Sequence, residues 1–278
     1  MRLPRLLLVI ATSVALTATA ATNAEKARAT AEAMKAGGGP AGSATAGAKV
    51  VGPAPVRAPA DDFRPTPADA PLVAGGLTRI TCLYRGTDPY HYQLWLPADY
   101  AAAPTRARPT LFIAAPGGKA TLGAMADWVQ RHGYVAVMLE ESRNGDWEPT
   151  VGNFLAAHDD VVKRVRVAEG RKVATGMSGA ARACSVFVGL RPGFGGLLFQ
   201  AAGYAAVGPN GASPLPGIKV PAIAATFGEK DPNYAEGPRM KRLFGDRMEL
   251  FEFRGGHQWA PQATVEEALD SIDARLPK

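Results

Sequence analysis

The sequence predicts an α/β protein, a three-layer sandwich with a mostly parallel, eight-stranded sheet and helices on both faces. From about residue 77 onward, short apolar runs alternate with longer amphipathic stretches, as in strands joined by crossover helices. Only a short segment, 86–90, with turn-forming residues separates the first two runs, which favours an antiparallel hairpin. The later runs have room for a helix between them and should pair in parallel, so the sheet is mixed with an antiparallel edge.

Each expected element follows from this alternation. Strands are expected at 77–84, 91–96, 110–114, 134–139, 171–175, 196–200, 222–227 and 247–253. The second strand alternates as a half-buried strand does, with Tyr92, Leu94 and Leu96 on one face. The stretches between the later strands predict helices at 122–131, 151–167, 179–190 and 233–244, and a last helix at 264–276 follows the final strand. No repeat interrupts this order, so residues 75–278 are expected to form one domain.

Residues 1–24 have the pattern of a secretory signal peptide. Two arginines precede an apolar core at 6–16, and small residues at Ala18 and Ala20 fit a cleavage site. An uncleaved membrane anchor is the alternative, but the apolar core is shorter than the roughly 20 residues that a spanning helix needs. We expect a secreted or periplasmic protein, cleaved near Ala20 or Ala24, with no stable membrane insertion afterwards.

Residues 25–74 are expected to form a disordered or extended tether. Ala, Gly, Pro and Thr dominate the segment, and its few larger apolar residues follow no period. Such a composition offers too little apolar surface to offset the entropy of ordering the chain. The segment therefore predicts no site of its own.

Charge and cysteine content bear on several classes of function. The formal net charge of +6 is mild, and the basic residues are scattered without interleaved aromatics, which argues against a nucleic-acid partner. No Cys/His cluster has the spacing of zinc ligands, so neither a metal nor another cofactor is expected. Cys82 and Cys184 are the only cysteines, and the sequence leaves open whether they form a disulfide or stay two buried thiols.

The segment Gly176-Met177-Ser178-Gly179-Ala180 lies between an expected strand and an expected helix. This is the setting of a nucleophile elbow, a sharp turn that strains a serine and needs small neighbours. The turn would place the Ser178 hydroxyl at the carboxyl edge of the sheet and at a helix N-terminus, which favours developing negative charge. Ala180 stands where the motif usually has glycine. Because a serine that merely caps a helix is the alternative, the rest of the chain must decide.

A nucleophilic serine needs a general base, and the expected chain order is serine, acid, histidine. His257 is the only histidine after Ser178, and it lies in a Gly-rich loop after the last expected strand. No Asp or Glu occurs between Ser178 and Gly228, so Glu229 and Asp231 are the first acids available. We predict that Asp231 orients His257, with Glu229 as the alternative acid and simple helix capping as the alternative role of Asp231.

Acyl transfer through a serine also needs N–H donors for the oxyanion, usually a pair. Gly179, the residue after Ser178, is expected to supply one of them. The other is expected from the loop after the third strand, 115–119, where Gly118 is our choice and Lys119 the alternative.

With these segments in order, the chain from about residue 77 onward resembles an α/β-hydrolase-fold serine esterase. It is similar to the secreted polyhydroxybutyrate-depolymerase, feruloyl-esterase and dienelactone-hydrolase-like group in GMSGAAR around Ser178, GEKDPNY around Asp231 and GGHQW around His257. The resemblance implies an α/β-hydrolase fold and hydrolysis of carboxylic esters, including polyester, feruloyl or acetyl esters. Pro116 departs from it, because many relatives carry histidine there, and dienelactone hydrolases use cysteine as the nucleophile.

Substrate contacts are expected from two aromatic residues in loops near the site. Trp147 follows the fourth strand and Trp259 lies beside His257, and both either bind substrate or only pack. The segment 201–219 is short and rich in Gly and Pro, so no lid is expected, and an open site suits a bulky or polymeric ester. A serine peptidase of the same fold and a non-catalytic binding protein on this scaffold are the alternative functions.

Overall fold

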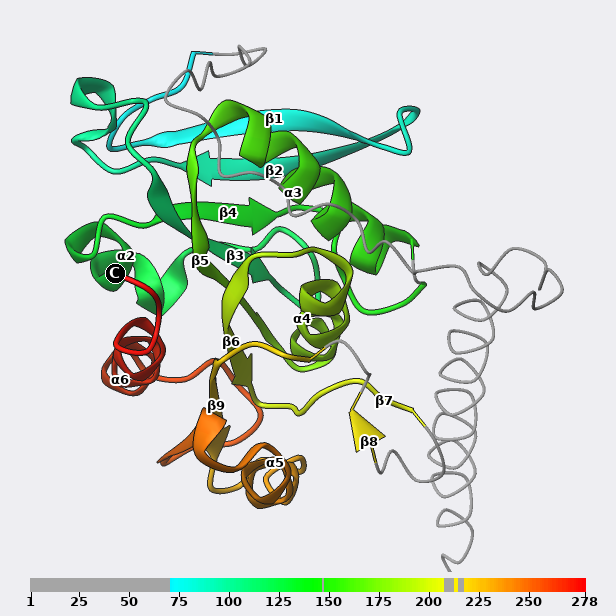
Figure 1. Ribbon diagram of the computed structural model, residues 1–278. Helices are drawn as coiled ribbons and strands as arrows, with labels where there is room; N and C mark the ends of the chain where they lie inside the picture. The colour runs from blue at the N-terminus through cyan, green and yellow to red at the C-terminus, as the bar shows by residue number, and fades with distance from the viewer. Residues whose placement is uncertain (1–70, 147, 208–212, 215–217) are drawn as a thin grey trace, which may run out of the picture. The chain divides into compact units, whose positions relative to one another are not determined.

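The computed structural model describes residues 71–146, 148–207, 213–214 and 218–278 (Figure 1). Three sequence-based predictions fall wholly or mostly outside these residues. They are the signal peptide at 1–24, the tether at 25–74 apart from its last four residues, and the role of Trp147.

Eight strands form one open sheet. They are β1 (Leu77–Tyr84), β2 (Asp88–Trp95), β3 (Arg108–Ala114), β4 (Val135–Leu139), β5 (Val167–Met177), β6 (Phe194–Gln200), β9 (Ala222–Gly228) and β10 (Met248–Phe253), in the order β1-β2-β4-β3-β5-β6-β9-β10. β2 runs antiparallel to both of its neighbours, and every other pair in the sheet is parallel. The mixed sheet with an antiparallel hairpin at its edge, expected from the sequence, is confirmed.

Two strands of the structure were not expected. β7 (Ala206–Val207) and β8 (Ser213–Pro214) form a separate two-stranded sheet. Strands of two residues are too short to show an alternating pattern, so the sequence gives no signal for them. β5 also begins earlier than predicted, because its first residues, with Glu169 and Gly170, lack the apolar run that marked the strand.

Five helices join or follow the strands of the large sheet: α2 (Ala126–Arg131), α3 (Asn153–Arg164), α4 (Gly179–Leu190), α5 (Glu236–Phe244) and α6 (Gln262–Asp273). Single turns of other helix types occur at η1 (Tyr100–Ala102), η2 (Gly123–Met125), η3 (Glu148–Gly152) and η5 (Gly245–Arg247). The predicted starts of α2, α3 and α5 are a few residues too early. In the first two cases η2 or η3 occupies the missing turn, and before α5 the chain folds into tight turns instead. Within the described residues, none of the helices has the length and apolarity needed to cross a membrane.

The sheet separates two apolar clusters, because successive strand residues point to opposite faces. In β3, Phe112 and Ala114 pack into one cluster, whereas Leu111 and Ile113 pack into the other. The first cluster includes residues of α3, α4 and α5, and the second includes residues of α2 and α6. Figure 1 shows α2 and α6 on one side of the sheet and α3 and α4 on the other, so the predicted three layers are confirmed.

The two cysteines are free thiols, and both are buried. Cys82 lies in β1, where its thiol donates a hydrogen bond to the carbonyl of Tyr90 at 3.4 Å. Burial raises the pKa of Cys82 to about 12 and also raises the pKa of Cys184. Of the two alternatives left open by the sequence, the structure has the buried, unreactive thiols rather than the disulfide.

A buried lysine, Lys172, lies midway along β5, beside the first residue of β6. The Lys172 side chain donates to the carbonyl of Pro192, and its Nζ lies 2.9 Å from Nε2 of His158. Burial lowers the pKa of His158, and the His158 Nδ1 lies 2.9 Å from a carboxylate oxygen of Asp159. The neutral His158 ring therefore donates through Nδ1 to Asp159, and its Nε2 lone pair accepts a hydrogen bond from the Lys172 ammonium. Burial also lowers the pKa of Lys172 itself to about 8.

The lowered pKa predicts a component of stability that grows with pH. The unfolded chain holds the Lys172 proton up to about pH 10.4, whereas the folded chain releases it near pH 8. The unfolded state therefore binds more protons between these values, and the folded state gains stability as pH rises through this window. Urea unfolding measures the free energy of unfolding of the wild type and of Lys172→Met. The value for the wild type minus the value for the variant should increase by roughly 2–3 kcal/mol from pH 7 to pH 10. A difference that stays constant over this range would contradict the lowered pKa.

Candidate active site

Ser178 occupies a strained turn between β5 and α4. β5 ends at Met177, α4 begins at Gly179, and Ser178 between them has φ 56° and ψ −128°. A positive φ is uncommon for a residue with a side chain and costs free energy that the surrounding structure must offset. Part of this support is a hydrogen bond of 2.9 Å from the Ser178 N–H to the carbonyl of Gln200, at the end of β6.

The small residues around Ser178 are required by backbone contacts. A Cβ added to Gly176 would lie 2.8 Å from the carbonyl carbon and 2.9 Å from the carbonyl oxygen of Ala180. Both are main-chain atoms that cannot move aside as a flexible side chain does. Ala180, the departure from the usual motif, is buried without conflict. The turn predicted from the sequence is therefore present and depends on glycine at position 176.

His257 joins Ser178 to a buried carboxylate. Its Nε2 lies 2.9 Å from the Oγ of Ser178, and its Nδ1 lies 3.0 and 3.2 Å from the two carboxylate oxygens of Asp231. The Asp231 side chain is 0% exposed, against 33% for that of His257. A buried carboxylate needs partners, and Asp231 has a second one in the N–H of Asn233, at 2.7 Å. These contacts fix the imidazole so that Nδ1 donates to Asp231 and Nε2 faces the serine hydroxyl.

Backbone hydrogen bonds hold together the two loops that carry the acid and the histidine. The Glu229 N–H donates to the carbonyl of Phe253 at 3.0 Å, and the Lys230 N–H donates to the carbonyl of Gly255 at 2.9 Å. A Cβ at Gly228 would lie 2.4 Å from the carbonyl oxygen of Gly256, so glycine is needed for this close approach. The Glu229 side chain has no described contact with His257, and Asp231 is the acid that meets the ring.

The expected pair of oxyanion donors is only partly available. Within the described residues, the N–H of Gly179 has no hydrogen-bond acceptor, so it is free to bind a ligand. The N–H of Gly118 instead donates to the carbonyl of Ala115 at 3.0 Å. The N–H of the alternative, Lys119, donates to the carbonyl of Glu140 at 2.8 Å. Both N–H groups of this loop are therefore already paired with main-chain carbonyls, and the expected role of Gly118 stays a prediction that this pairing does not favour.

A side chain that the sequence analysis did not single out lies against Gly179. The Asn144 amide oxygen would lie only 2.1 Å from a Cβ added at Gly179, and the amide nitrogen 3.1 Å from it. Asn144 is placed there by its own N–H, which donates to the carbonyl of Pro116 at 2.8 Å. Its loop was predicted to border the site, but nothing in the sequence shows which of its polar residues faces the elbow.

Trp259 lines a cavity of about 300 Å³ beside the segments that carry Ser178 and His257. Its walls come from the loops after β3 and β10, from η2, from the end of β6 and from the start of α6. Trp259 is partly buried there and packs against the apolar cluster that contains α2 and α6. The expectation that Trp259 borders the site agrees with this position.

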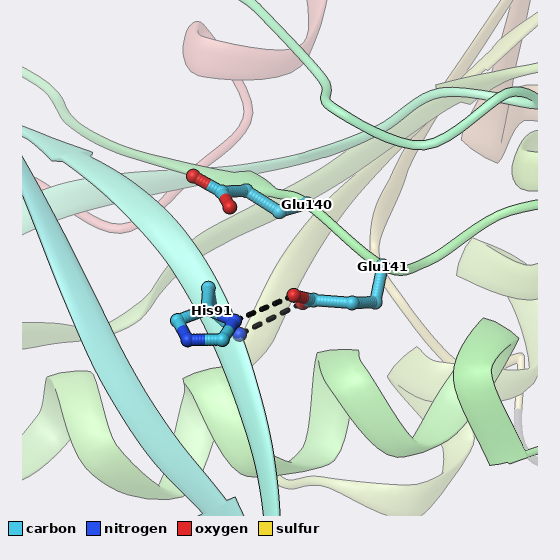
Figure 2. Close-up of side chains that lie close together, drawn as sticks. All are labelled: His91, Glu140 and Glu141. Atoms are coloured by element: carbon cyan, nitrogen blue, oxygen red, sulfur yellow. Dashed lines mark hydrogen bonds and ion pairs between the residues drawn. The ribbon is translucent and has the colours of Figure 1, made fainter.

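A cluster of His91, Glu140 and Glu141 has potential metal ligands within 4.8 Å of one another, and it is the only such group among the described residues. Figure 2 shows Glu141 directed at His91, whose main-chain N–H donates to it at 2.7 Å and whose Nδ1 lies 2.6 Å from it. The Glu140 carboxylate accepts hydrogen bonds from Arg79 and Gln93. These existing partners account for the charges, so we assign the cluster a role in joining β1, β2 and the end of β4.

Neither protein-family models nor curated proteins match this sequence, but solved structures match the fold. An S-formylglutathione hydrolase from Staphylococcus aureus has a TM-score of 0.53 at 11% identity, covering 72% of this chain and 98% of that one. A ferulic acid esterase has a TM-score of 0.53 at 12% identity, with coverage of 73% and 99%. A dienelactone hydrolase-like promiscuous phosphotriesterase from metagenomic libraries has a TM-score of 0.52 at 14% identity, with coverage of 73% and 100%.

The chain has the α/β-hydrolase fold. The resemblance predicted from the three sequence segments is thereby confirmed at the level of architecture. In the α/β-hydrolase fold the nucleophile follows a central strand, and the acid and histidine come later in the chain. Ser178, Asp231 and His257 occupy these places, at the ends of β5, β9 and β10. Because a fold does not determine a reaction, the function has to be argued from this site.

The contact at Gly176 predicts that the elbow does not tolerate a methyl group. Gly176→Ala should lower the free energy of unfolding by about 2–3 kcal/mol, because the new Cβ would overlap the backbone of Ala180. Gly256→Ala is the matched control, since its Cβ would meet no atom within 4 Å and its φ is not positive. That variant should stay within about 0.5 kcal/mol of the wild type in urea unfolding. Equal losses in the two variants would contradict the requirement for glycine at 176.

Proposed function

We propose that the protein is an exported serine hydrolase of carboxylic esters. The observation that carries the proposal is the unbroken series of hydrogen bonds from the Ser178 hydroxyl through His257 to the buried carboxylate of Asp231. The esterases among the solved structures with this fold support the class of substrate. The signal-peptide pattern of residues 1–24 supports export.

In the proposed reaction, the Ser178 Oγ attacks the ester carbonyl carbon while Nε2 of His257 takes the hydroxyl proton. The tetrahedral intermediate then expels the alcohol, which receives this proton from the imidazolium, and an acyl-enzyme remains. Water attacks the acyl-enzyme with the same general base, and the acid leaves as Ser178 regains its proton. The starting distance of 2.9 Å between the oxygen and Nε2 suits direct proton transfer.

Asp231 stabilises the imidazolium that forms during each half-reaction. Its burial away from water strengthens the interaction with a charged ring. The hydrogen bond from the Asn233 N–H fixes the carboxylate in orientation. The acid therefore holds the tautomer that leaves Nε2 free to accept the serine proton.

For the oxyanion we propose the N–H of Gly179 and the side-chain amide of Asn144 as donors. The Gly179 N–H is unused and lies at the start of α4, where the helix dipole favours negative charge. The Asn144 amide packs directly against Gly179. With the Gly118 and Lys119 N–H groups engaged elsewhere, an asparagine amide is a chemically suitable second donor, since side-chain amides serve this purpose in other hydrolytic sites.

Labelling with a fluorophosphonate probe tests whether Ser178 is an activated nucleophile. The wild type should be labelled and should hydrolyse short-chain p-nitrophenyl esters. Ser178→Ala should abolish labelling and lower kcat by at least about ten-thousandfold, and His257→Ala should slow both reactions severely. A feruloyl, acetyl, polyester and peptide panel then identifies the substrate class. Folded wild-type protein that is not labelled would favour the binding-protein alternative, and release of amines without release of acids from esters would favour the peptidase.

Substitution of Asn144 tests the second oxyanion donor. Asn144→Ala should lower kcat about a hundredfold with little change in KM, because a transition-state contact is lost. Asn144→Asp, which keeps the shape but offers a carboxylate to the oxyanion, should be at least as impaired. Unfolding by urea and labelling at saturating probe establish that the elbow is intact in both variants. If kcat is unchanged in Asn144→Ala, the second donor lies elsewhere.

A further inference from the structure

The cavity of about 300 Å³ beside the site has the size of a small-molecule pocket. Most of its lining is apolar, with side chains of Ala115, Leu122, Met125, Trp259, Ala260 and Val265. The polar exceptions include Lys119 and Gln200. The cavity therefore offers a mainly apolar surface, and the exposed residue Lys119 is among those that line it.

Gln200 connects this cavity to the reacting groups. Its main-chain carbonyl accepts the Ser178 N–H at 2.9 Å, and its side-chain oxygen accepts the Ala260 N–H at 3.3 Å. Trp259 follows His257 by only two residues. The cavity therefore lies next to the segments that carry Ser178 and His257.

Lys119 is the cation of this cavity, and its ammonium has no partner within the described residues. No described ion pair or hydrogen bond involves the Lys119 side chain, whereas many surface arginines of this chain pair with carboxylates. None of the residues that line the cavity carries a negative charge. The ammonium is therefore available to an anionic ligand.

The backbone at Lys119 has a conformation that would suit glycine better. Its φ is 49°, and Gly118 before it has φ 79°. A non-glycine residue at positive φ is strained, and such strain gathers at ligand-binding sites. The hydrogen bond from the Lys119 N–H to the carbonyl of Glu140 holds the conformation. A long cationic side chain thus stands at a position where the backbone alone would favour glycine.

We propose that the cavity binds the arm of an ester substrate that carries a negative charge, with the apolar part of the arm against Trp259 and Met125 and its anionic group at Lys119. This inference rests on the proposed ester hydrolysis and names its substrate class: esters with an apolar acyl or alcohol arm that ends in a carboxylate. A carboxylate is recognised by an ammonium through charge-assisted hydrogen bonds. The apolar walls contribute by burying the rest of the arm.

Matched pairs of substrates test this inference on the mature protein. For the acyl arm the pair is p-nitrophenyl hexanoate and the mono-p-nitrophenyl ester of adipic acid, which has the same chain length and a terminal carboxylate. For the alcohol arm the pair is phenyl butyrate and para-carboxyphenyl butyrate. In at least one pair, kcat/KM should be roughly fivefold to tenfold higher for the anionic ester. This preference should weaken as salt concentration rises.

Lys119→Met should bring the ratio of anionic to neutral kcat/KM to about one or below, and Lys119→Arg should keep most of the preference. Lys219→Met is the control, since it removes the same charge from an exposed residue that does not line the cavity. Its ratio should equal that of the wild type. If Lys119→Met does not fold, Lys119→Gly, which suits the positive φ, takes its place.

Failure of this inference differs from failure of the proposed function. Wild-type protein that is labelled at Ser178 and hydrolyses both members of each pair equally well would overturn the anionic arm and leave ester hydrolysis standing. A preference that survives in Lys119→Met would overturn the assignment to Lys119. Absence of labelling and of turnover for every ester would overturn the proposed function, and this inference with it.

Discussion

The hydrogen bonds between the loops after β9 and β10 are the constraint on which the geometry of the site depends. β9 and β10 are parallel neighbours with Gly228 paired to Phe253, so their carboxyl ends lie side by side. Two backbone bonds then join the loops, from Glu229 to Phe253 and from Lys230 to Gly255. Only after this pairing can a fully buried carboxylate and a partly exposed imidazole meet at 3.0 Å. The pair is therefore positioned by main-chain atoms, which are less mobile than the side chains they carry.

The serine end of the series depends on a second constraint, the strained turn at Ser178. β5 and β6 are parallel neighbours, and the last bond between them, from the Ser178 N–H to Gln200, holds the residue beyond the end of its strand. The strained turn directs the hydroxyl toward the histidine, and within the described part of the chain the Gly179 N–H has no acceptor. The sheet thus carries both Ser178 and the pair of Asp231 and His257. The order of the strands sets the distance between the serine and this pair.

The sequence contains enough to predict the sheet and the three hydrogen-bonded residues Ser178, His257 and Asp231. Parallel strands appear as apolar runs, and the Gly-rich elbow is recognisable because its turn admits few residue types. The acid could be narrowed to Glu229 or Asp231 only because the fifty residues after Ser178 hold no carboxylate. The choice between these two follows from the structure, in which the turn at Gly228 directs Asp231 inward.

What the sequence could not predict lies in contacts between loops. The oxyanion donor was expected in the loop after β3 by its glycines, but glycine indicates that a turn is permitted and does not say where its N–H groups point. Their direction is set by the carbonyls of Ala115 and Glu140, one of which belongs to the segment after β4. The position of Asn144 likewise depends on its bond to Pro116 across the same two loops. The starts of three helices were also misplaced, because η2 and η3 take the turn before α2 and α3, and tight turns precede α5.

The hydrogen bonds between the loops after β3 and β4 underlie two proposals: Asn144 as an oxyanion donor and Lys119 as the group that binds an anionic arm of the substrate. The bond from Lys119 to Glu140 holds the positive φ at Lys119, on the cavity wall, and the bond from Asn144 to Pro116 places the amide against Gly179. Both bonds involve main-chain atoms of the same pair of segments, which also form an isolated β-bridge between Gly117 and Arg143. A proline at 116 has no N–H of its own to offer the oxyanion, but its carbonyl accepts the bond that brings Asn144 into place. Pro116, the departure from the resemblance, is thus compatible with the proposed site, in which the second oxyanion donor is a side chain and Lys119 binds the anionic arm of the substrate.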